Sequence, residues 1–324
     1  MSSAHSLTDI LTKGLRKLVG IDRPKPTGYR MIDVELKQRI ALSPSLTRLV
    51  FGGADIDQTY TLAPDQRIKL FFPAADGTLP DLRQQADWYK ARGQIAPERR
   101  PPMRTYTIRA LRPETAELDV DFVLHGISGP ASAWATQAQI GDHLQMLVPN
   151  RDFDGDPGGY EWKPPAGIRN ILLIGDETAL PAIAGILEEL AQTPNTPNVQ
   201  AFIEVPHETD CLPLRCSPQT RLNWLPRDVI NSAHGEAMIH AARELASLPA
   251  SNGAKQSTAP LAEIDIEQQI LWEQAHPADN DFYAWVAGES AAVMAIRRHL
   301  IKERGLDRRA LTLMGYWRLG RAAN

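Results

Sequence analysis

Residues 171–183 read ILLIGDETALPAI, and this stretch decides the fold of the second half of the chain. The apolar run Ile171–Ile174 predicts a strand buried on both faces, and the apolar spacing of Leu180–Leu190 predicts a helix directly after it. Buried strands that alternate with helices are typical of a parallel sheet. The pattern recurs, with strands expected at 199–205, 221–225, 282–287 and 311–317 and helices at 236–248 and 290–303. Residues 166–324 are therefore predicted to form an α/β domain with a parallel sheet and an insertion at 249–275.

The first half of the chain has a different pattern. Short segments rich in β-formers alternate with turn residues, and Leu118, Val120 and Phe122 show the alternation of a strand with one buried face. The expected strands are 30–38, 45–51, 67–73, 104–111, 117–124 and 143–148. Residues 29–165 are therefore predicted to form a six-stranded antiparallel β-barrel. The polar stretch 74–102 is interpreted as a surface insertion, and residues 1–28 as an N-terminal helical extension, either packed on the protein or lying on a membrane surface.

Composition excludes several classes of protein. The 324 residues carry a formal net charge of -4, which argues against a non-specific nucleic-acid binder. Two cysteines, Cys211 and Cys216, supply neither a disulfide scaffold nor the four thiolates of an iron–sulfur cluster. No apolar run approaches the roughly 20 residues of a membrane span, so stable membrane insertion is not expected. The cytoplasm is the default location, and a monomer is expected. The eight histidines are scattered, and no metal site of the protein's own is predicted.

The segment 104–109, RTYTIR, carries the most informative chemistry of the barrel half. On a strand, Arg104 and Tyr106 point to one side and Thr105 and Thr107 to the other. A flavin needs a flat aromatic neighbour, a cation for its diphosphate and a hydroxyl that can bond its reactive ring nitrogen, and this strand offers all three. An ordinary amphipathic strand with a surface arginine is the alternative interpretation of these residues alone.

A second segment, GPASAWA at 129–135, follows the strand that ends near Val123 and the dipeptide His125-Gly126. A helix that begins near Ala131 or Ser132 would direct free backbone amides at a diphosphate, and its dipole would favour the negative charge. A helix that is merely capped by Ser132 is the alternative when the segment is taken by itself. Together, the two segments predict a flavin site on the barrel.

The pattern Arg-x-Tyr-Thr followed by Gly-x-x-Ser resembles the ferredoxin-reductase-like flavoproteins. The longer strings RTYTIR, DFVLHG, GPASAWA, GDETALPAI, WVAGE and GYWR resemble the siderophore-interacting protein family of ferric-siderophore reductases, over about residues 29–320. This resemblance implies an FAD barrel, a nucleotide-binding α/β domain and reduction of imported ferric siderophores by NADH or NADPH. It implies catalytic roles for Tyr106 and Thr107, and FAD contacts for Arg104, Thr105, Tyr106, Thr107, Val123, His125, Gly129, Ala131, Ser132 and Trp134.

Two strand-to-helix turns are the candidates for NAD(P)H. They comprise Gly175, Asp176, Glu177, Thr178 and Ala179 after one strand, and Ala287, Gly288 and Glu289 after another. The first turn is a poor phosphate cradle, because it has one glycine and two carboxylates that would repel a diphosphate. We therefore expect either that this turn faces the nicotinamide end or that nucleotide binding is weak. Thr178 can cap the helix that follows.

Coenzyme preference is left open by the sequence. Glu204 lies where a carboxylate often binds a ribose hydroxyl and favours NADH. His207 and Arg215 could instead serve the 2′-phosphate of NADPH.

The expected substrate brings its iron already chelated, and many ferric siderophores are anionic. Cations near the flavin are therefore expected. The candidates are Lys69, Arg151 and Arg318, with Trp317 as an aromatic neighbour of the flavin. Two other functions remain open: a general flavin or quinone reductase, including one that is fed by a ferredoxin, and a non-catalytic siderophore-binding protein.

Overall fold

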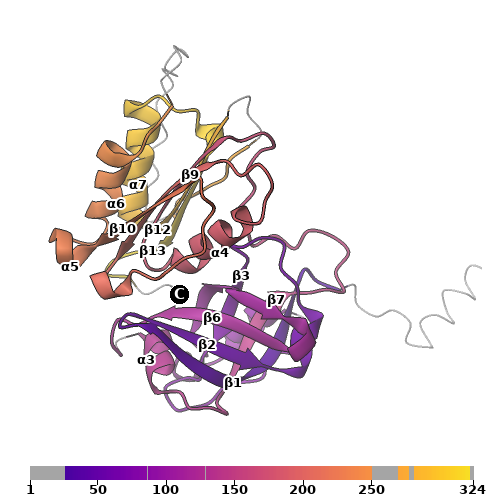
Figure 1. Cartoon of the computed structure of the whole chain (residues 1–324). Helices are drawn as coiled ribbons and strands as arrows, with labels where there is room; N and C mark the ends of the chain where they lie inside the picture. The colour runs from indigo at the N-terminus through magenta and orange to yellow at the C-terminus, as the bar shows by residue number, and fades with distance from the viewer. Residues whose placement is uncertain (1–25, 86, 128, 250–268, 277–280, 322–324) are drawn as a thin grey trace, which may run out of the picture.

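The computed structural model describes residues 26–85, 87–127, 129–249, 269–276 and 281–321. The chain forms two domains, with the β-rich N-terminal domain below the α/β domain in Figure 1. The predicted N-terminal helix and most of the 249–275 insertion lie outside the described residues. No helix of the described residues is long and apolar enough to cross a membrane.

The N-terminal domain is one curled antiparallel sheet of seven strands, in the order β4-β3-β7-β1-β2-β6-β5. Its strands are β1 (Tyr29–Ser43), β2 (Leu46–Gly52), β3 (Arg67–Phe71), β4 (Met103–Thr107), β5 (Ala110–Arg112), β6 (Glu117–Val123) and β7 (His143–Pro149). The predicted antiparallel barrel is confirmed in its direction of pairing, but the strand count of six was wrong.

The extra strand arises because the predicted strand 104–111 is divided in two. β4 pairs with β3, whereas β5 pairs with β6 at the opposite edge of the sheet. Only Ile108 and Arg109 separate them: the amide of Ile108 donates to Gln66 O, and that of Arg109 donates to Asp119 O. The two edges of the curled sheet therefore meet at this dipeptide.

Helix α3 (Pro130–Gln137) packs on the barrel core. The Trp134 ring lies 6.1 Å from that of Phe51 in a stacked arrangement and 5.8 Å from that of Phe72. The 74–102 insertion contains helix α2 (Trp88–Gln94). It is less of a surface excursion than predicted, because Leu82 is buried against Phe71.

The α/β domain has a six-stranded sheet in the order β10-β9-β8-β12-β13-β11. Its strands are β8 (Asn170–Gly175), β9 (Asn198–Val205), β10 (Thr220–Pro226), β11 (Trp272–Glu273), β12 (Phe282–Glu289) and β13 (Leu311–Trp317). Five strands are parallel, as predicted. The two-residue strand β11, from the end of the predicted insertion 249–275, pairs antiparallel with β13 and makes the sheet mixed.

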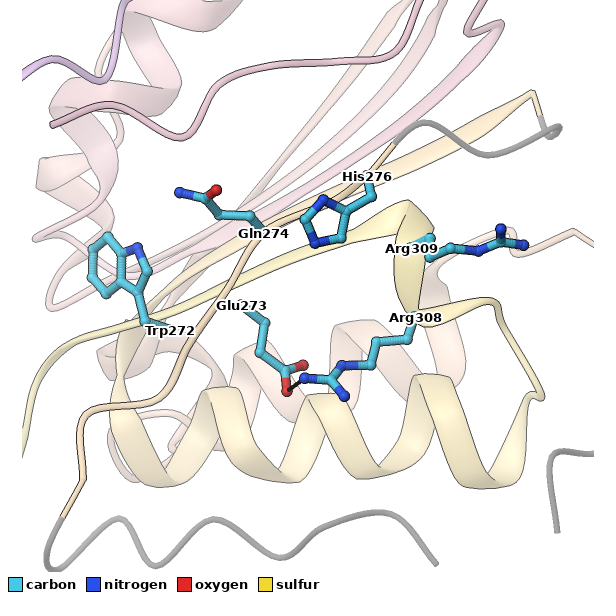
Figure 2. A pocket seen from close by; sticks show the side chains of 6 residues that line it. All are labelled: Trp272, Glu273, Gln274, His276, Arg308 and Arg309. Atoms are coloured by element: carbon cyan, nitrogen blue, oxygen red, sulfur yellow. Dashed lines mark ion pairs between the residues drawn. The ribbon is translucent and has the colours of Figure 1, made fainter. Parts of the chain in front are cut away.

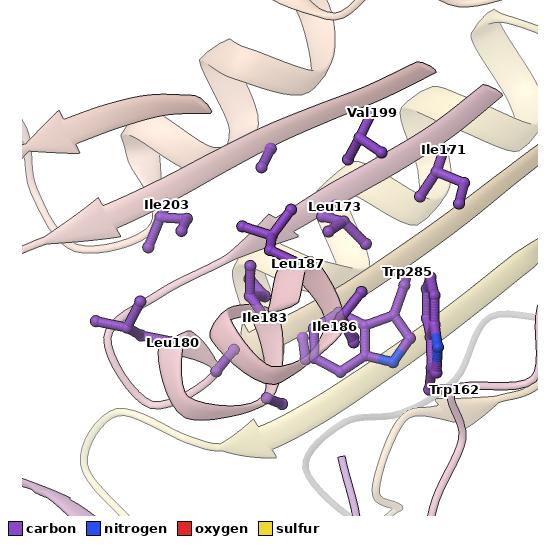
Figure 3. Packing of buried hydrophobic residues seen from close by; sticks show 14 of the residues in the cluster. Trp162, Ile171, Leu173, Leu180, Ile183, Ile186, Leu187, Val199, Ile203 and Trp285 are labelled. Atoms are coloured by element: carbon purple, nitrogen blue, oxygen red, sulfur yellow. The ribbon is translucent and has the colours of Figure 1, made fainter. Parts of the chain in front are cut away.

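Helices cover both faces of this sheet (Figure 1). Helix α4 (Leu180–Leu190) packs on one face in a cluster with Leu173, Ile203 and Trp285, which Figure 3 shows. The other face packs against helices α6 (Glu236–His240) and α7 (Ser290–Arg298), each extended by a π-helical turn, Ala241–Leu245 and His299–Glu303 respectively. The short helix α5 (Arg227–Ile230) follows β10 directly.

The two domains meet through buried contacts. One oxygen of Asp65, at the start of β3, accepts hydrogen bonds from the amides of Glu161 and Trp162 at 2.9 Å and from the indole of Trp285 at 3.4 Å. Asp210, which is fully buried after β9, accepts from the Ser43 hydroxyl at 2.6 Å. Asp65 of the barrel thus binds an indole of the α/β sheet, and Asp210 of the α/β domain binds a hydroxyl of the barrel.

Candidate functional site

The carboxyl ends of the five parallel strands bring charged and aromatic side chains to one edge of the α/β sheet. Asp176 follows β8, Glu204 is the penultimate residue of β9, and Arg227 follows β10. Glu289 and Trp317 are the last residues of β12 and β13. The strand order changes direction between β8 and β12, and open α/β sheets bind ligands at such a switch point. This edge faces the barrel, so it is the candidate site of the α/β domain (Figure 1).

Asp176 is fully buried and both of its carboxylate oxygens are hydrogen-bonded. Oδ1 accepts from the amide of Thr178 at 2.9 Å and from its hydroxyl at 2.5 Å. Oδ2 accepts from the amide of Glu289 and from the indole nitrogen of Trp317, both at 2.9 Å. Asp176 therefore joins two turns and orients Trp317, and its carboxylate oxygens are occupied within the protein.

Glu177 and Glu204 share one arginine. Arg227 forms a two-pronged ion pair with Glu177, at 2.8 and 2.9 Å, and donates to Glu204 at 3.0 Å. The fully buried Glu204 also accepts from the amides of Gly235 and Met238. Its carboxylate is thus occupied within the protein and does not face a ribose hydroxyl.

His234 completes this network. Its Nε2 lies 3.5 Å from Glu177 and 3.8 Å from Asp176, and its ring meets the Trp317 ring edge-on, with the ring centres 4.8 Å apart. These ion-pair distances exceed ordinary hydrogen bonds, and both ring nitrogens are buried without a hydrogen-bond partner. Sequence reasoning missed Arg227 and His234. The available signal for Arg227 was its position directly after a predicted parallel strand.

Burial and neighbouring charges set the ionisation of this network. Burial, followed by the charge of Glu177, raises the pKa of Asp176 to about 6. Burial also acts to raise the pKa of Glu177, but the hydrogen bonds from Arg227 and the nearby charges of Arg227 and His234 outweigh it and lower that pKa to about 2. For His234 burial acts to lower the pKa, but Glu177 and Asp176 raise it overall. The network therefore keeps a proton on Asp176 and on His234 to a higher pH than either group would hold it in water.

The other predicted nucleotide residues have structural contacts of their own. A Cβ on Gly288, whose φ is +151°, would lie 2.6 Å from the Asp176 carboxylate, so this glycine makes room for Asp176. Glu289 caps α7 by accepting from the amides of Ala291 and Ala292. The cap predicted for Thr178 is wrong: Ala179 occupies the N-cap of α4, with no side-chain cap hydrogen bond. Gly175 packs against α4, and Ala287 is buried beside it in the sheet.

On the barrel, the predicted flavin strand is β4. The half-buried Arg104 donates from Nη1 to the carbonyl of Met103 at 2.8 Å. The Tyr106 ring packs on Phe122, with 4.4 Å between the ring centres, and burial raises the pKa of its phenol. Thr105 is exposed, whereas Thr107 is buried at the end of β4 that meets the α/β domain.

The loop after β6 is held by Ser132, whose hydroxyl donates to the carbonyl of Gly126 at 2.6 Å and accepts from the amide of His125. This hydroxyl does not cap α3. The helix begins at Pro130 after its N-cap residue Gly129, where there is no side-chain cap hydrogen bond. The first-turn amides of Ala131 and Ser132 precede the intrahelical hydrogen bonds and suit an anion. Val123 packs toward the cluster of α4, and His125 is exposed.

The predicted substrate residues do not form one group. Lys69 lies on β3 opposite Thr105 and donates to its hydroxyl at 3.3 Å. Arg151 lies after β7 and donates to the carbonyl of Thr59. Trp317 and Arg318 lie at the end of β13, where Trp317 belongs to the network of Asp176.

A pocket of about 520 Å³ opens at the β11 edge of the sheet (Figure 2). Its charged groups are paired: Glu273 with Arg297 and Arg308, and Arg309 with Asp307. None of the predicted site residues lines it; the lining residues are Trp272, Glu273, Gln274, His276, Arg308 and Arg309. The pocket is therefore separate from the candidate site.

Comparisons with known proteins assign both domains. Residues 35–153 match a siderophore-interacting FAD-binding domain, and residues 168–320 match the siderophore-interacting protein family. An uncharacterized protein of Mycobacterium tuberculosis is 33% identical over 292 residues, 86% of this chain and 87% of its own. The ferric vibriobactin reductase ViuB of Vibrio cholerae is 29% identical over 90% of each chain. A siderophore utilization protein from T. fusca superposes with a TM-score of 0.64, at 26% identity over 91% of this chain and 95% of its own.

The barrel with its FAD-domain sequence and the α/β domain facing it define a flavoprotein oxidoreductase. Within this class, the chain belongs to the siderophore-interacting protein family.

Proposed function

We propose that the protein is an FAD-dependent reductase that takes electrons from NADH or NADPH and passes them to ferric iron in a siderophore. The observation that carries this proposal is the strand β4, which presents Arg104, Tyr106 and Thr107 beside the junction with the α/β domain. The reductase ViuB, which is 29% identical over nearly the whole chain, supports the same activity.

The barrel residues fit an FAD molecule. Arg104 is half-buried with only a backbone carbonyl as its hydrogen-bond partner among the described residues, so its charge is available to a diphosphate. The uncapped first turn of α3 offers amides to the same group. Tyr106 would lie against the flavin ring and Thr107 would place its hydroxyl at the reactive nitrogen.

The mechanism rests on positioning. Bound FAD would supply a hydride acceptor for the nicotinamide and a one-electron donor for Fe(III), and hard oxygen ligands bind the resulting Fe(II) more weakly. Arg104 and the first turn of α3 would hold the diphosphate end, and Tyr106 would orient the ring. On the α/β side of the domain junction, the hydrogen bond to Asp176 holds the Trp317 ring in place. Because Asp176 and Glu177 turn inward, the coenzyme would bind over the backbone of these turns.

The iron substrate would meet the flavin from the side of Lys69. This ammonium group lies on the outer face of β3 and has the hydroxyl of Thr105 as its partner. A local positive charge raises the concentration of an anionic chelate at the site. The siderophore would bring its own iron ligands.

The visible spectrum of the purified protein, recorded anaerobically, tests this function. We expect a flavin spectrum that bleaches with NADH or NADPH and returns when a ferric siderophore is added. If the flavin bleached only with a reduced ferredoxin, the electron donor would be that ferredoxin and not NADH or NADPH. A protein that cannot be loaded with FAD would overturn the proposal.

The variant Arg104→Ala provides a second test. It removes the charged partner of the diphosphate, worth about 1.5–3 kcal/mol, so FAD should bind at least tenfold more weakly. Equilibrium dialysis against FAD measures this directly. Unchanged FAD affinity in a folded Arg104→Ala protein would mean that β4 does not bind the cofactor.

A further inference from the structure

The 74–102 insertion is anchored on the outer face of the barrel. The ring of Trp88, at the start of α2, meets Phe71 of β3 edge-on at 5.4 Å between centres. Leu82 and Met103 complete this apolar contact, and Ala91 and Ile95 pack against it from α2 and its C-terminal end. Helix α2 is thus fixed beside β3 and β4, the two strands that carry the cations of the proposed site.

Helix α2 brings a further cation to these strands. Arg92 is half-buried, and its Nε donates to the carbonyl of Pro101 at 2.9 Å. Arg100 donates to the carbonyls of Gly93 and Ile95 at 3.0 Å, which caps the C-terminal end of α2 and holds the helix in place.

These cations lack acidic partners. Lys69, Arg92, Arg100 and Arg104 donate to carbonyl or hydroxyl oxygens, and none forms an ion pair with a carboxylate in the part of the chain that the structure describes. The neighbouring Arg99, in contrast, lies 3.9 Å from Asp76.

The positive charges of these residues lower one another's pKa values. Burial lowers the pKa of Lys69, and the charges of Arg67 and Arg92 lower it further. Burial, then the charges of Arg100 and Arg104, lower the pKa of Arg92. Half-buried like charges without a counter-charge are unfavourable, and a bound anion removes this cost.

We propose that Arg92 of the insertion is an anion-binding residue, which acts with Lys69 at the outer face of the barrel on a ligand with several closely spaced anionic oxygens. The inference rests on the proposed function for its two candidate ligands, the diphosphate of FAD and a trianionic ferric tris-catecholate. A planar guanidinium suits both, because it donates two parallel hydrogen bonds to paired oxygens. The insertion then has a function: it supplies a second cation beside Lys69.

The test compares Arg92→Gln with Lys90→Ala. Lys90 lies on the same helix and its side chain is exposed, so its loss removes an equal charge outside the site. Binding is measured with FAD, by equilibrium dialysis, and with the FAD-loaded protein and gallium(III) tris-catecholate, by calorimetry. Gallium(III) is redox-inert, so this second binding measurement does not depend on turnover. The neutral gallium(III) tris-hydroxamate is the uncharged counterpart.

We expect Arg92→Gln to lower the affinity for one of the two anionic ligands about tenfold, because one charge-assisted hydrogen bond is lost. Lys90→Ala should leave both affinities within about twofold of wild type. Weaker FAD binding identifies the diphosphate as the anion; weaker catecholate binding, with the hydroxamate unchanged, identifies the siderophore. Arg92→Lys keeps the charge without the planar guanidinium. Its affinity should lie between those of Arg92→Gln and Lys90→Ala.

Equal affinities of Arg92→Gln and Lys90→Ala for both anions, in proteins with unchanged thermal unfolding, would overturn the inference. Failure of the proposed function gives a different result. A wild-type protein that binds FAD and the gallium complex but does not reduce ferric siderophores would contradict the reductase and leave the role of Arg92 intact.

Discussion

Asp176 illustrates how a single side chain can be functional in position and structural in its contacts. A carboxylate at the switch point of an α/β sheet is a candidate for ligand binding from sequence alone. In the folded chain it accepts four hydrogen bonds, two of them from Thr178 and one each from Glu289 and Trp317. Its side chain therefore fixes the position of the Trp317 indole, and sequence alone could suggest Trp317 only as an aromatic neighbour of the flavin.

Asp176 should make the stability of the protein depend on pH. Its folded-state pKa of about 6 lies above its ordinary value of 3.8, so the folded protein holds this proton more tightly. The resulting stability is complete below about pH 4 and is lost as pH rises through about 6. We expect the free energy of unfolding of wild type, relative to Asp176→Asn, to fall by about 2–3 kcal/mol between pH 4 and 7.

Urea unfolding of both proteins across this pH range measures the difference. Parallel curves for wild type and Asp176→Asn would show that Asp176 does not titrate differently on folding. His234 is present in both proteins, so the comparison isolates Asp176 and its coupling to the network.

Thr107 allows a direct test of chemistry at the barrel. Thr107→Val keeps the shape of the buried side chain and removes the hydroxyl proposed to contact the reactive ring nitrogen. FAD should remain bound, and reduction by NAD(P)H should slow by about tenfold or more, as expected for one lost hydrogen bond. Stopped-flow measurement of flavin bleaching gives the rate. A wild-type rate would assign Thr107 to packing alone.

At the scale of elements, the apolar patterns predicted the parallel strands well because those strands are buried on both faces. The split between β4 and β5 could not be predicted in this way. It depends on Ile108 and Arg109 donating to opposite sheet edges, a tertiary arrangement that local pattern does not contain. β11 was missed for a similar reason: two residues, Trp272 and Glu273, carry no periodicity, and only their pairing with β13 makes them a strand.

The candidate site shows the same limit. Sequence placed Asp176, Glu289 and Trp317 at strand ends, and the structure brings them together. It could not show that their polar groups bind one another, because that depends on partners from different strands. The convergence of Arg227 and His234 on Glu177 is the clearest example.

The turn between β12 and α7 provides a prediction for an element. In Gly288→Ala, the new Cβ would lie 2.6 Å from a buried carboxylate oxygen, at a φ of +151° that side chains disfavour. We expect a loss of about 2–4 kcal/mol in the free energy of unfolding. Gly141→Ala is the control, because its φ is +99° with nothing within 4 Å of the added Cβ. Gly141→Ala should lose about 1–2 kcal/mol in the free energy of unfolding. Equal losses in the two variants would show that a Cβ at position 288 does not clash with Asp176.

For the whole molecule, the domain junction determines how the two halves behave together. Arg109 of the barrel forms a bidentate ion pair with Glu188 of α4, and a Cβ on Gly185 of α4 would lie 3.0 Å from Pro64 of the barrel. Trp162, which enters the α/β core, bonds Glu189 through its indole. Contacts this close and this buried predict that the domains unfold together.

Asp65 tests this cooperativity. Asp65→Ala would leave the amides of Glu161 and Trp162 and the indole of Trp285 without an acceptor, at a cost of about 3 kcal/mol or more. Burial raises the pKa of Asp65, and one of its oxygens has no partner. Asp65→Asn keeps the needed acceptor but places its NH2 where that oxygen is buried without a partner, so its loss of stability should be smaller than that of Asp65→Ala but not zero.

Thermal unfolding should be followed by two signals: release of FAD, which reports the barrel, and far-ultraviolet circular dichroism, to which the helices of the α/β domain contribute most. In wild type and Asp65→Asn the two midpoints should coincide, and in Asp65→Ala both should fall together. Separate midpoints in the wild-type protein would show that the junction does not couple the domains. A loss in Asp65→Asn as large as that in Asp65→Ala would show that the charge of Asp65, and not its hydrogen bonds, holds the junction.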